Sequence, residues 1–220
     1  MHLRRPYVEF EDFLRDRIHL GSRVLDLCSG TGKYAMFAAV KGAQVTCADM
    51  ALNSLKIAEM RAVRAGVKIA IVQADAEELP FGKETFQIVT CVGSLSYLSL
   101  PKFLKETHRV LEPGGYFVCV DSLNHNPVYR LNRSIQWILR RRALSTLQRM
   151  PTLKTIAELQ RHFCDSRISY HGSLAFVAPV LRPFFGERLA SQWLDGLNDR
   201  TPVLRRWAFK FAFCGQKPPI

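Results

Sequence analysis

Residues suited to binding a charged small molecule follow the first apolar segment of the chain. Residues 23–32 read as a short buried strand with Asp26 near its end, and then as a turn that contains Gly30 and Gly32 and leads into a predicted helix over residues 33–41. Glycine permits positive φ angles and close approach of backbone to a ligand, and a helix N-terminus offers free N–H groups to a carboxylate or phosphate. The turn therefore predicts a ligand site without naming the ligand.

The turn also fits the dinucleotide fingerprint, so a nicotinamide or flavin cofactor is one interpretation. A Walker-type phosphate loop is excluded, because Leu27 lies where its first glycine should be and Tyr34 where its Ser or Thr should be.

Two further acids point away from a dinucleotide. Asp49 ends a predicted strand over residues 44–48, where a carboxylate would chelate a ribose diol. Asp75 follows a third predicted strand over residues 69–73, where an acid next to a small residue can read the edge of an adenine. Asp26 is placed to accept hydrogen bonds from an amino group. Together the three acids suit a ligand with an amino acid end, a ribose and an adenine.

These segments resemble the class I S-adenosylmethionine-dependent methyltransferase family, in its broad small-molecule branch. Four motifs occur in the family's order: Val-Leu-Asp-Leu-x-x-Gly-Thr-Gly at 24–32, an acid at Asp49, Asp-Ala-x-x-Leu-Pro-Phe at 75–81 and Arg-Val-Leu-x-Pro-Gly-Gly at 109–115. The resemblance covers residues 20–121. It implies S-adenosylmethionine as methyl donor, with S-adenosylhomocysteine as product.

The resemblance also implies an α/β fold. We expect a Rossmann-like, seven-stranded, mostly parallel sheet with helices on both faces and a helical insertion after the fifth strand. The remaining strands are predicted at 86–92, 116–120, 167–171 and 207–214, and the remaining helices at 7–19, 101–111 and 153–163, the last N-capped by Thr152.

The chain is long enough for one well-buried core, so a single domain is expected over residues 1–220. We divide it into an N-terminal lid helix in 1–20, a cofactor-binding core over 21–121, and substrate-side insertions at 122–150 and 172–206.

Residues expected to hold the cofactor lie at strand ends and in the lid, where Tyr7 is placed to reach the cofactor carboxylate. The set is Tyr7, Asp26, Cys28, Ser29, Gly30, Gly32, Asp49, Met50, Asp75, Ala76, Cys91, Val92 and Tyr97. Two positions depart from the family pattern: Cys28 replaces a glycine, and Gln87 replaces an aspartate. We expect Cys28 to reduce tolerance of backbone movement without abolishing binding.

The acceptor is expected at the insertion over 122–150. Its apolar residues recur at three- and four-residue steps beside basic ones, which predicts an amphipathic helix that caps the active site, lies on a membrane surface, or does both. Arg130 and Arg133 are placed to grip an acidic substrate, or form a solvated basic face. The expected acceptor-binding residues are Asp121, Asn124, Tyr129, Arg130 and Arg133.

His125 is the candidate general base for a hydroxyl acceptor, because it follows the fifth strand and its ordinary pKa suits proton transfer near neutrality. The alternative is that His125 orders the insertion through Asn124 and Asn126. No clustered acids suggest a metal, so no metal site is expected.

Basic charge is concentrated outside the predicted cofactor core. Residues 1–121 hold 15 Lys and Arg against 14 Asp and Glu, whereas residues 122–220 hold 16 against 5, out of a net charge of +12. This imbalance indicates an anionic substrate or surface rather than a solvated face alone. Phosphates, uronic acids, lipid headgroups and RNA all carry the required charge.

The six cysteines are widely spaced without a Cys-x-x-Cys pair, so reduced core thiols are expected. No secretion signal or membrane-spanning run is recognisable, which predicts a cytoplasmic protein, with peripheral contact at the inner face of the membrane through the basic insertion.

The functional hypothesis is methyl transfer to oxygen of a sugar or another small anionic acceptor, in polysaccharide or natural-product biosynthesis. The segment Asn-His-Asn-Pro-x-Tyr-Arg-Leu-Asn-Arg at 124–133 resembles a bacterial branch associated with surface-polysaccharide gene clusters. One alternative is an RNA or protein methyltransferase, although the chain lacks an Asn-Pro-Pro-Tyr motif or an RNA-binding module, so nucleic acid is a less favoured partner. The other is an inactive S-adenosylmethionine-binding protein of the membrane surface.

Overall fold

A computed structural model describes residues 4–139, 146, 148–174 and 207–219. Its helices are α1 (Arg5–Arg15), α2 (Ala35–Val40), α3 (Leu52–Arg64), η1 (Leu95–Tyr97), α4 (Leu100–Val110), α5 (Pro127–Ile138) and α7 (Leu153–His162). Its strands are β1 (Arg23–Leu27), β2 (Gln44–Asp49), β3 (Ile69–Gln73), β4 (Phe86–Val92), β5 (Leu111–Ser122), β6 (Cys164–His171) and β7 (Lys210–Gln216).

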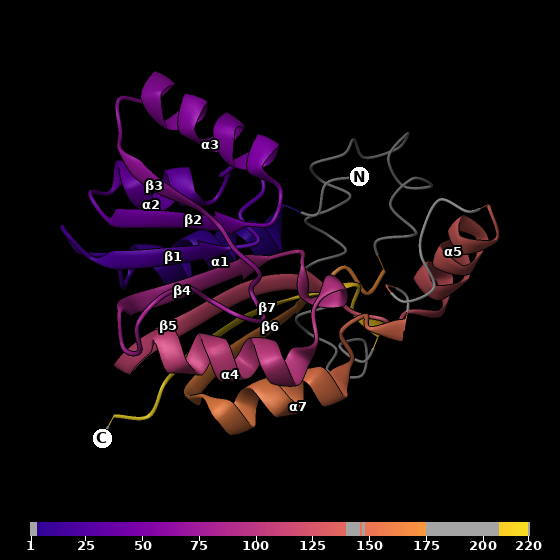
Figure 1. Ribbon diagram of the computed structural model, residues 1–220. Helices are drawn as coiled ribbons and strands as arrows, with labels where there is room; N and C mark the ends of the chain where they lie inside the picture. The colour runs from indigo at the N-terminus through magenta and orange to yellow at the C-terminus, as the bar shows by residue number, and fades with distance from the viewer. Residues whose placement is uncertain (1–3, 140–145, 147, 175–206, 220) are drawn as a thin grey trace.

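The strands form one sheet in the order β3-β2-β1-β4-β5-β7-β6 (Figure 1). Strands β1 to β5 pair in parallel, and β7 runs antiparallel to both β5 and β6. This architecture confirms the predicted seven-stranded, mostly parallel α/β fold. Because the parallel strands point the same way, their carboxyl ends lie along one edge of the sheet.

Strand β5 begins at Leu111, five residues before the predicted start. Leu111 pairs with Phe86, and the register then shifts before Tyr116 pairs with Ile88. Gly115 lies at this irregularity, and a Cβ there would come within 2.9 Å of the backbone oxygens of both Gln87 and Glu112. The Pro-Gly-Gly motif therefore allows the strand to pass through a crowded bend.

Gln87 differs from the aspartate of the family pattern, and its side chain has a local partner. Its Oε1 accepts a hydrogen bond from the backbone N–H of Arg23 at 3.1 Å. Gln87 thereby joins β4 to the first residue of β1, at the edge of the sheet opposite the glycine turn.

Two apolar layers enclose the sheet. On one face, side chains of α1, α2 and α3 pack on the central strands, with Phe10 and Leu55 fully buried. On the other face, α4 and α7 lie side by side, and Phe103 and Leu159 are fully buried (Figure 1). Helix α1 therefore contributes to the core, while its expected role as a lid stays a prediction.

Thr152 begins α7 as predicted, in a capping box with Thr155, whose Oγ1 accepts the Thr152 N–H at 3.0 Å.

Helix α5 stands apart from both helix layers, beyond the carboxyl ends of the strands (Figure 1). Asn126 is fully buried and its side-chain oxygen caps the helix by accepting the N–H groups of Val128 and Tyr129. Its Nδ2 donates to the backbone oxygens of Ser173 at 3.0 Å and Trp207 at 2.8 Å. Asn126 therefore caps α5 and also binds the backbone at Ser173 and Trp207.

Most of the predicted second insertion, residues 175–206, lies outside the described residues, as do 140–145 and 147 of the first. No helix in the part of the chain that the structure describes is long and apolar enough to cross a membrane.

Candidate functional site

The glycine turn after β1 adopts left-handed backbone at three alternate residues. The φ angles of Cys28, Gly30 and Gly32 are 52°, 52° and 69°. A Cβ on Gly32 would lie 2.7 Å from the Cβ of Ala58 in α3, so only glycine fits there. Cys28 occupies the left-handed region where the family has glycine, a conformation that costs a non-glycine residue about 1–2 kcal/mol.

Asp49, the last residue of β2, binds the turn directly. Its Oδ2 accepts the Gly30 N–H at 2.8 Å, and its Oδ1 accepts the Ala51 N–H at 2.8 Å. A carboxylate has about four lone-pair positions, so each oxygen retains capacity for a ligand hydroxyl. The neighbouring Met50 is 68% exposed. Asp49 and Met50 therefore lie on the open side of the turn, and their cofactor role stays a prediction.

Asp26 lies behind the turn, and its expected contact with a ligand amino group stays a prediction. Its side chain accepts a hydrogen bond from Thr90 Oγ1 at 2.7 Å and another from the Ala35 N–H. Burial raises the pKa of Asp26 to about 7, against the lowering effect of these two hydrogen bonds. With 2% of the residue exposed, Asp26 supports the turn by joining β1, β4 and α2.

Cys91 also lies within the core. It is fully buried at the end of β4, and a hydrogen bond with the Cys28 thiol, together with burial, raises its pKa. The next residue, Val92, and Ser29 of the turn are half-buried. Cys91 therefore supports the turn from inside, and its expected cofactor contact stays a prediction.

Asp75 and Ala76 lie in a segment that a second motif holds in place. Asp75 is exposed and its Oδ1 accepts the Glu77 N–H at 2.9 Å, while Ala76 is buried. Arg109 of α4 donates to the backbone oxygens of Phe81 at 2.7 Å and Leu79 at 3.0 Å. The Arg-Val-Leu motif thus anchors the Asp-Ala-x-x-Leu-Pro-Phe motif, a link that sequence reasoning missed.

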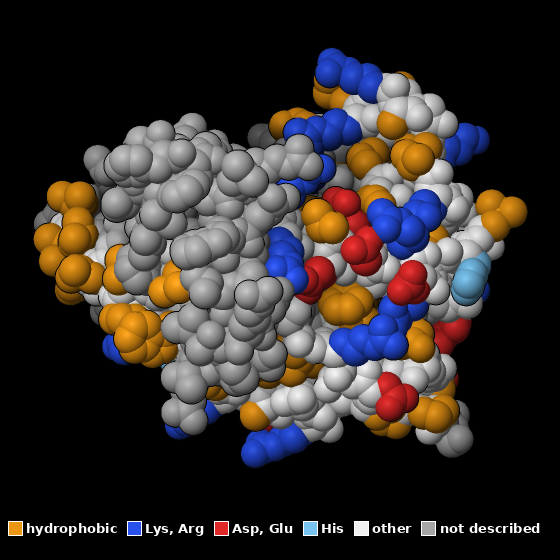
Figure 2. Space-filling model, turned by 180° about the vertical axis from the view of Figure 1, so that it is seen from behind, with side chains coloured by type: hydrophobic (Ala, Val, Ile, Leu, Met, Phe, Trp, Pro, Cys, Tyr) orange, Lys and Arg blue, Asp and Glu red, His pale blue; other side chains and the backbone are white. Residues whose placement is uncertain are grey.

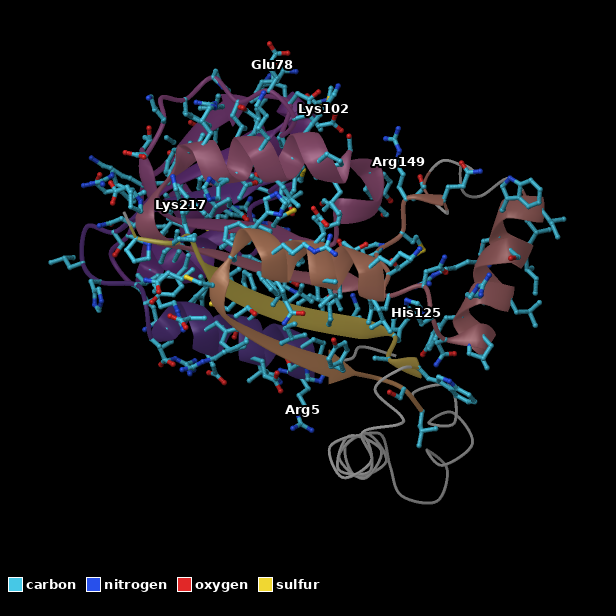
Figure 3. The ribbon with its side chains drawn as sticks, turned by 90° about the horizontal axis from the view of Figure 1, so that it is seen from below. Arg5, Glu78, Lys102, His125, Arg149 and Lys217 are labelled. Atoms are coloured by element: carbon cyan, nitrogen blue, oxygen red, sulfur yellow. The ribbon has the colours of Figure 1, made fainter. Side chains whose placement is uncertain are left out.

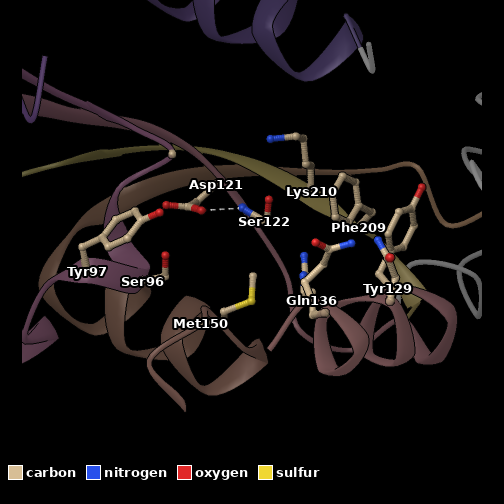
Figure 4. A pocket seen from close by; sticks show the side chains of 12 residues that line it. Ser96, Tyr97, Asp121, Ser122, Tyr129, Gln136, Met150, Phe209 and Lys210 are labelled. Carbon is tan, nitrogen blue, oxygen red and sulfur yellow. Dashed lines mark hydrogen bonds between the residues drawn. The ribbon is translucent and has the colours of Figure 1, made fainter. Parts of the chain in front are cut away.

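A cavity of about 280 Å³ opens beyond the ends of β4 and β5, between η1 and α5 (Figure 4). It brings together four predicted residues from separate elements: Tyr97, Asp121, Tyr129 and Arg133. Sequence reasoning missed the other lining residues, which are Gly93, Ser96, Ser122, Asn132, Gln136, Met150, Phe209 and Lys210.

Asp121 is held at the cavity wall by backbone. Its Oδ2 accepts the Leu95 N–H at 2.8 Å and its Oδ1 accepts the Ser122 N–H at 2.6 Å (Figure 4). Burial raises the pKa of Asp121, although the nearby charges of Lys210 and Arg133 act in the opposite direction. The carboxyl group is therefore fixed in position at the end of β5.

The inner side of α5 carries a polar stripe, at helical spacing, formed by Tyr129, Asn132, Arg133 and Gln136. Arg133 is only 7% exposed and donates to the backbone oxygen of Leu123 at 3.0 Å. Its guanidinium lies 5.3 Å from the ring centroid of Phe209, on which Tyr129 stacks with a centroid distance of 3.9 Å. These four residues recur at three- and four-residue steps, so the helical period of the sequence could have identified the polar stripe.

His125 is not among the residues that line this cavity, and its role as general base stays a prediction. Its Nε2 accepts the N–H of Leu153 at 2.8 Å, in the first turn of α7. Figure 3 shows His125 at the end of α7 that faces α5. Burial and then the Arg130 charge lower the pKa of His125. This hydrogen bond joins the start of the insertion to α7, whereas the alternative interpretation expected contacts with Asn124 and Asn126.

The other two predicted acceptor residues also lie outside the cavity lining. Arg130 is exposed on α5. Asn124 accepts a hydrogen bond from Arg133 at 3.3 Å and so supports a residue that does line the cavity. Tyr7 lies nearby, because its hydroxyl accepts a hydrogen bond from Lys210 at 2.9 Å.

Titration of Asp26 should make the protein less stable as pH rises from about 4 to about 7. Because the folded pKa is about 7 and the ordinary value 3.8, the folded state binds the extra proton between these values. Stability is then lost as pH rises through that interval, by at most about 1.4 kcal/mol per pH unit. Urea unfolding at pH 5, 6, 7 and 8 gives the free energy of unfolding at each pH. For Asp26→Asn this free energy should change less with pH than it does for the parent. The exposed Asp16→Asn is the control, and equal slopes for Asp26→Asn and parent would contradict the assignment.

Comparisons with known proteins agree with this geometry. Residues 24–115 match the family model described as methyltransferase domain. The chain is 30% identical over 152 residues to sterol 4-C-methyltransferase strm-1 of Caenorhabditis elegans, covering 67% of this chain and 45% of that relative. It is 37% identical over 115 residues to demethylmenaquinone methyltransferase of Lysinibacillus sphaericus, covering 50% and 49%. The chain thus spans about half the length of these curated relatives.

Among solved structures, geranyl diphosphate C-methyltransferase of Streptomyces coelicolor has a similar fold, with a TM-score of 0.65 at 16% identity, covering 99% of this chain and 81% of that one. That structure contains Mg²⁺, geranyl diphosphate and S-adenosylhomocysteine. The ordered motifs, the sheet order and the matching domain model together show that the chain belongs to the class I S-adenosylmethionine-dependent methyltransferase family.

Proposed function

We propose that this protein transfers the methyl group of S-adenosylmethionine to an oxygen atom of a sugar or another small anionic acceptor. The observation that carries the proposal is the cavity beyond β4 and β5, which holds Asp121, Arg133 and Lys210 as its charged lining residues. Net positive charge in a small cavity favours an acidic guest. The names of the two curated relatives, a sterol 4-C-methyltransferase and a demethylmenaquinone methyltransferase, support a small-molecule acceptor.

The glycine turn has space for the cofactor. A Cβ on Gly30 would meet no atom within 4 Å, although its N–H already binds Asp49. The cofactor would lie along this turn, with its ribose hydroxyls at Asp49 and its adenine beside Asp75 and Ala76. When bound, it supplies an electrophilic methyl group on a sulfonium.

The contribution of the chain is orientation and exclusion of water, since methyl transfer requires in-line approach of the acceptor atom. Asp121 replaces His125 as the group proposed to orient an acceptor hydroxyl. Each of its oxygens is held by one backbone N–H, so one further lone pair per oxygen can accept the hydroxyl proton. Burial raises its pKa, which strengthens it as a proton acceptor near neutral pH.

The proposed setting is polysaccharide or natural-product biosynthesis in the cytoplasm, at the inner face of the membrane. The support for membrane contact is α5, whose buried residue is Arg133 while apolar side chains face outward. Leu131 is 64% and Ile138 is 69% exposed. Figure 2 shows hydrophobic side chains gathered at the edge of the molecule where α5 lies.

Charge also favours a lipid surface as the partner of α5. Residues 122–150 contain six arginines and no aspartate or glutamate. A helix with an apolar face among basic residues binds in the interface of an anionic bilayer, where each Lys or Arg near the surface contributes about 1 kcal/mol. This orientation would bring the inner stripe of α5, and with it the cavity, close to lipid-linked acceptors.

Asp49→Ala should weaken S-adenosylhomocysteine binding by about 10- to 100-fold, because a charged acceptor of two ribose hydroxyls and of the Gly30 N–H is lost. Isothermal titration calorimetry measures this difference. Asp16→Ala, on the exposed end of α1, is the matched control. Equal affinity of parent and Asp49→Ala, or no binding by the parent, would overturn the cofactor assignment.

Turnover should be found among anionic saccharides. A screen of nucleotide sugars and lipid-linked saccharides should yield S-adenosylhomocysteine with at least one of them, and Asp121→Asn should lower kcat by about 100-fold or more, as for loss of a group that accepts a proton. His125→Ala should retain turnover because its ring binds α7. Methylation of RNA or of a protein, with none of the saccharides, would contradict the acceptor proposal.

The protein should co-sediment with vesicles that contain phosphatidylglycerol and not with pure phosphatidylcholine. Replacing two outward apolar residues, as in Leu131→Glu with Ile138→Glu, should lower the bound fraction at least ~10-fold, since each lost side chain contributes about 1.5–3 kcal/mol of burial. Val63→Glu, on the exposed face of α3, should bind as the parent does. Equal co-sedimentation of all three proteins would exclude α5 as the membrane contact.

A further inference from the structure

Lys210 is a half-buried cation at the cavity whose position depends on residues far away in the sequence. It is the first residue of β7 and the register partner of Ser122 at the end of β5. Figure 4 shows it beside Ser122, on the same side of the cavity as Asp121. Within the described residues Lys210 forms no ion pair with a carboxylate at salt-bridge distance.

Two aromatic rings and one hydroxyl hold the ammonium group in place. Nζ of Lys210 donates to the Tyr7 hydroxyl at 2.9 Å and lies 5.1 Å from the Tyr7 ring centroid. It lies 5.7 Å from the ring centroid of Phe209. Cation–π contacts of this kind stabilise the charge while leaving other donors unused. Of the three N–H donors of an ammonium, one is committed to Tyr7.

Two other charged side chains lie near Lys210 among the residues that line the cavity. The guanidinium of Arg133 lies 5.3 Å from the ring centroid of Phe209, the ring that Lys210 also contacts. The carboxyl group of Asp121 also lies at this end, where its two oxygens accept the N–H groups of Leu95 and Ser122. Phe209 thus carries one cation from β7 and one from α5.

We propose that Lys210, positioned by Tyr7 and Phe209, forms an oxyanion subsite that binds a carboxylate or phosphate group of the acceptor. The inference deepens the proposed function and rests on it, because it names the chemistry that fixes the acceptor in the cavity. An ammonium with unused donors binds phosphate or carboxylate oxygens through charge-assisted hydrogen bonds. The subsite lies next to Asp121, so an anion held there places a neighbouring hydroxyl of the same molecule within reach of that carboxyl group.

The cofactor also carries a carboxylate that Lys210 could bind. The experiment therefore has to distinguish an oxyanion of the acceptor from the carboxylate of the cofactor. Inorganic phosphate is the probe. Its binding is measured from the broadening of its ³¹P NMR line by protein that is saturated with S-adenosylhomocysteine. Lys210→Ala should bind phosphate about tenfold more weakly, the factor for one lost charge-assisted hydrogen bond, and Lys210→Arg should restore most of the affinity. Lys154→Ala, which removes an exposed cation from α7, should bind as the parent does.

Isothermal titration calorimetry measures the affinity of the parent and of Lys210→Ala for S-adenosylhomocysteine. Unchanged affinity in Lys210→Ala supports an acceptor subsite, whereas a tenfold loss would assign the cation to the cofactor and overturn the proposal. Equal phosphate binding by Lys210→Ala and parent would also overturn it. Failure of the parent to bind S-adenosylhomocysteine would instead refute the proposed function, and the phosphate titration without cofactor would still test the subsite. Tyr7→Phe, which removes the acceptor of the Lys210 hydrogen bond, should weaken phosphate binding by a smaller factor than Lys210→Ala.

Discussion

Parallel pairing of β1 with both β2 and β4 is the constraint on which the rest of the site depends. Leu27 is the register partner of Ala48 on one side and of Cys91 on the other, so the three strands end together. This common edge brings Asp49 within hydrogen-bond distance of the Gly30 N–H, although nineteen positions separate them. It also leaves the residues after each strand free to form one continuous surface. Hydrogen-bonded pairing of buried backbone therefore fixes the distance between groups that would otherwise be independent.

Polar side chains also hold the backbone of the site in place. Asp26 receives hydrogen bonds from Thr90 and Ala35, so one carboxyl group links two strands to the helix that follows. Arg109 plays a comparable part for the segment after β3, through the backbone oxygens of Leu79 and Phe81. A buried polar group that is fully hydrogen-bonded makes its surroundings rigid, and a rigid surround is what a preformed site requires.

Helix α5 inverts the usual relation between polarity and burial. Its inner stripe, with Arg133 over Phe209, faces the cavity, and its apolar stripe faces outward. Desolvating an arginine is unfavourable unless hydrogen bonds and ring contacts compensate, and Arg133 has both, to Leu123 and to Phe209. The helix therefore presents a polar face to the cavity and an apolar face outward, and the proposed function assigns the first to the acceptor and the second to a lipid surface.

The sequence by itself determined the alternation of strands and helices in the parallel half, the glycine turn, the resemblance to the family and the position of Asp49, because these depend on local patterns of apolar residues, glycines and acids within about 100 residues. It also predicted four cavity residues, since each follows a strand or lies on the insertion. Only the tertiary structure decided that Asp26 is buried, that His125 caps α7, and that Lys210 meets Tyr7. Those outcomes depend on long-range packing: β7 returns antiparallel beside β5 and carries Lys210 across some 200 positions to α1, a contact that no local period encodes.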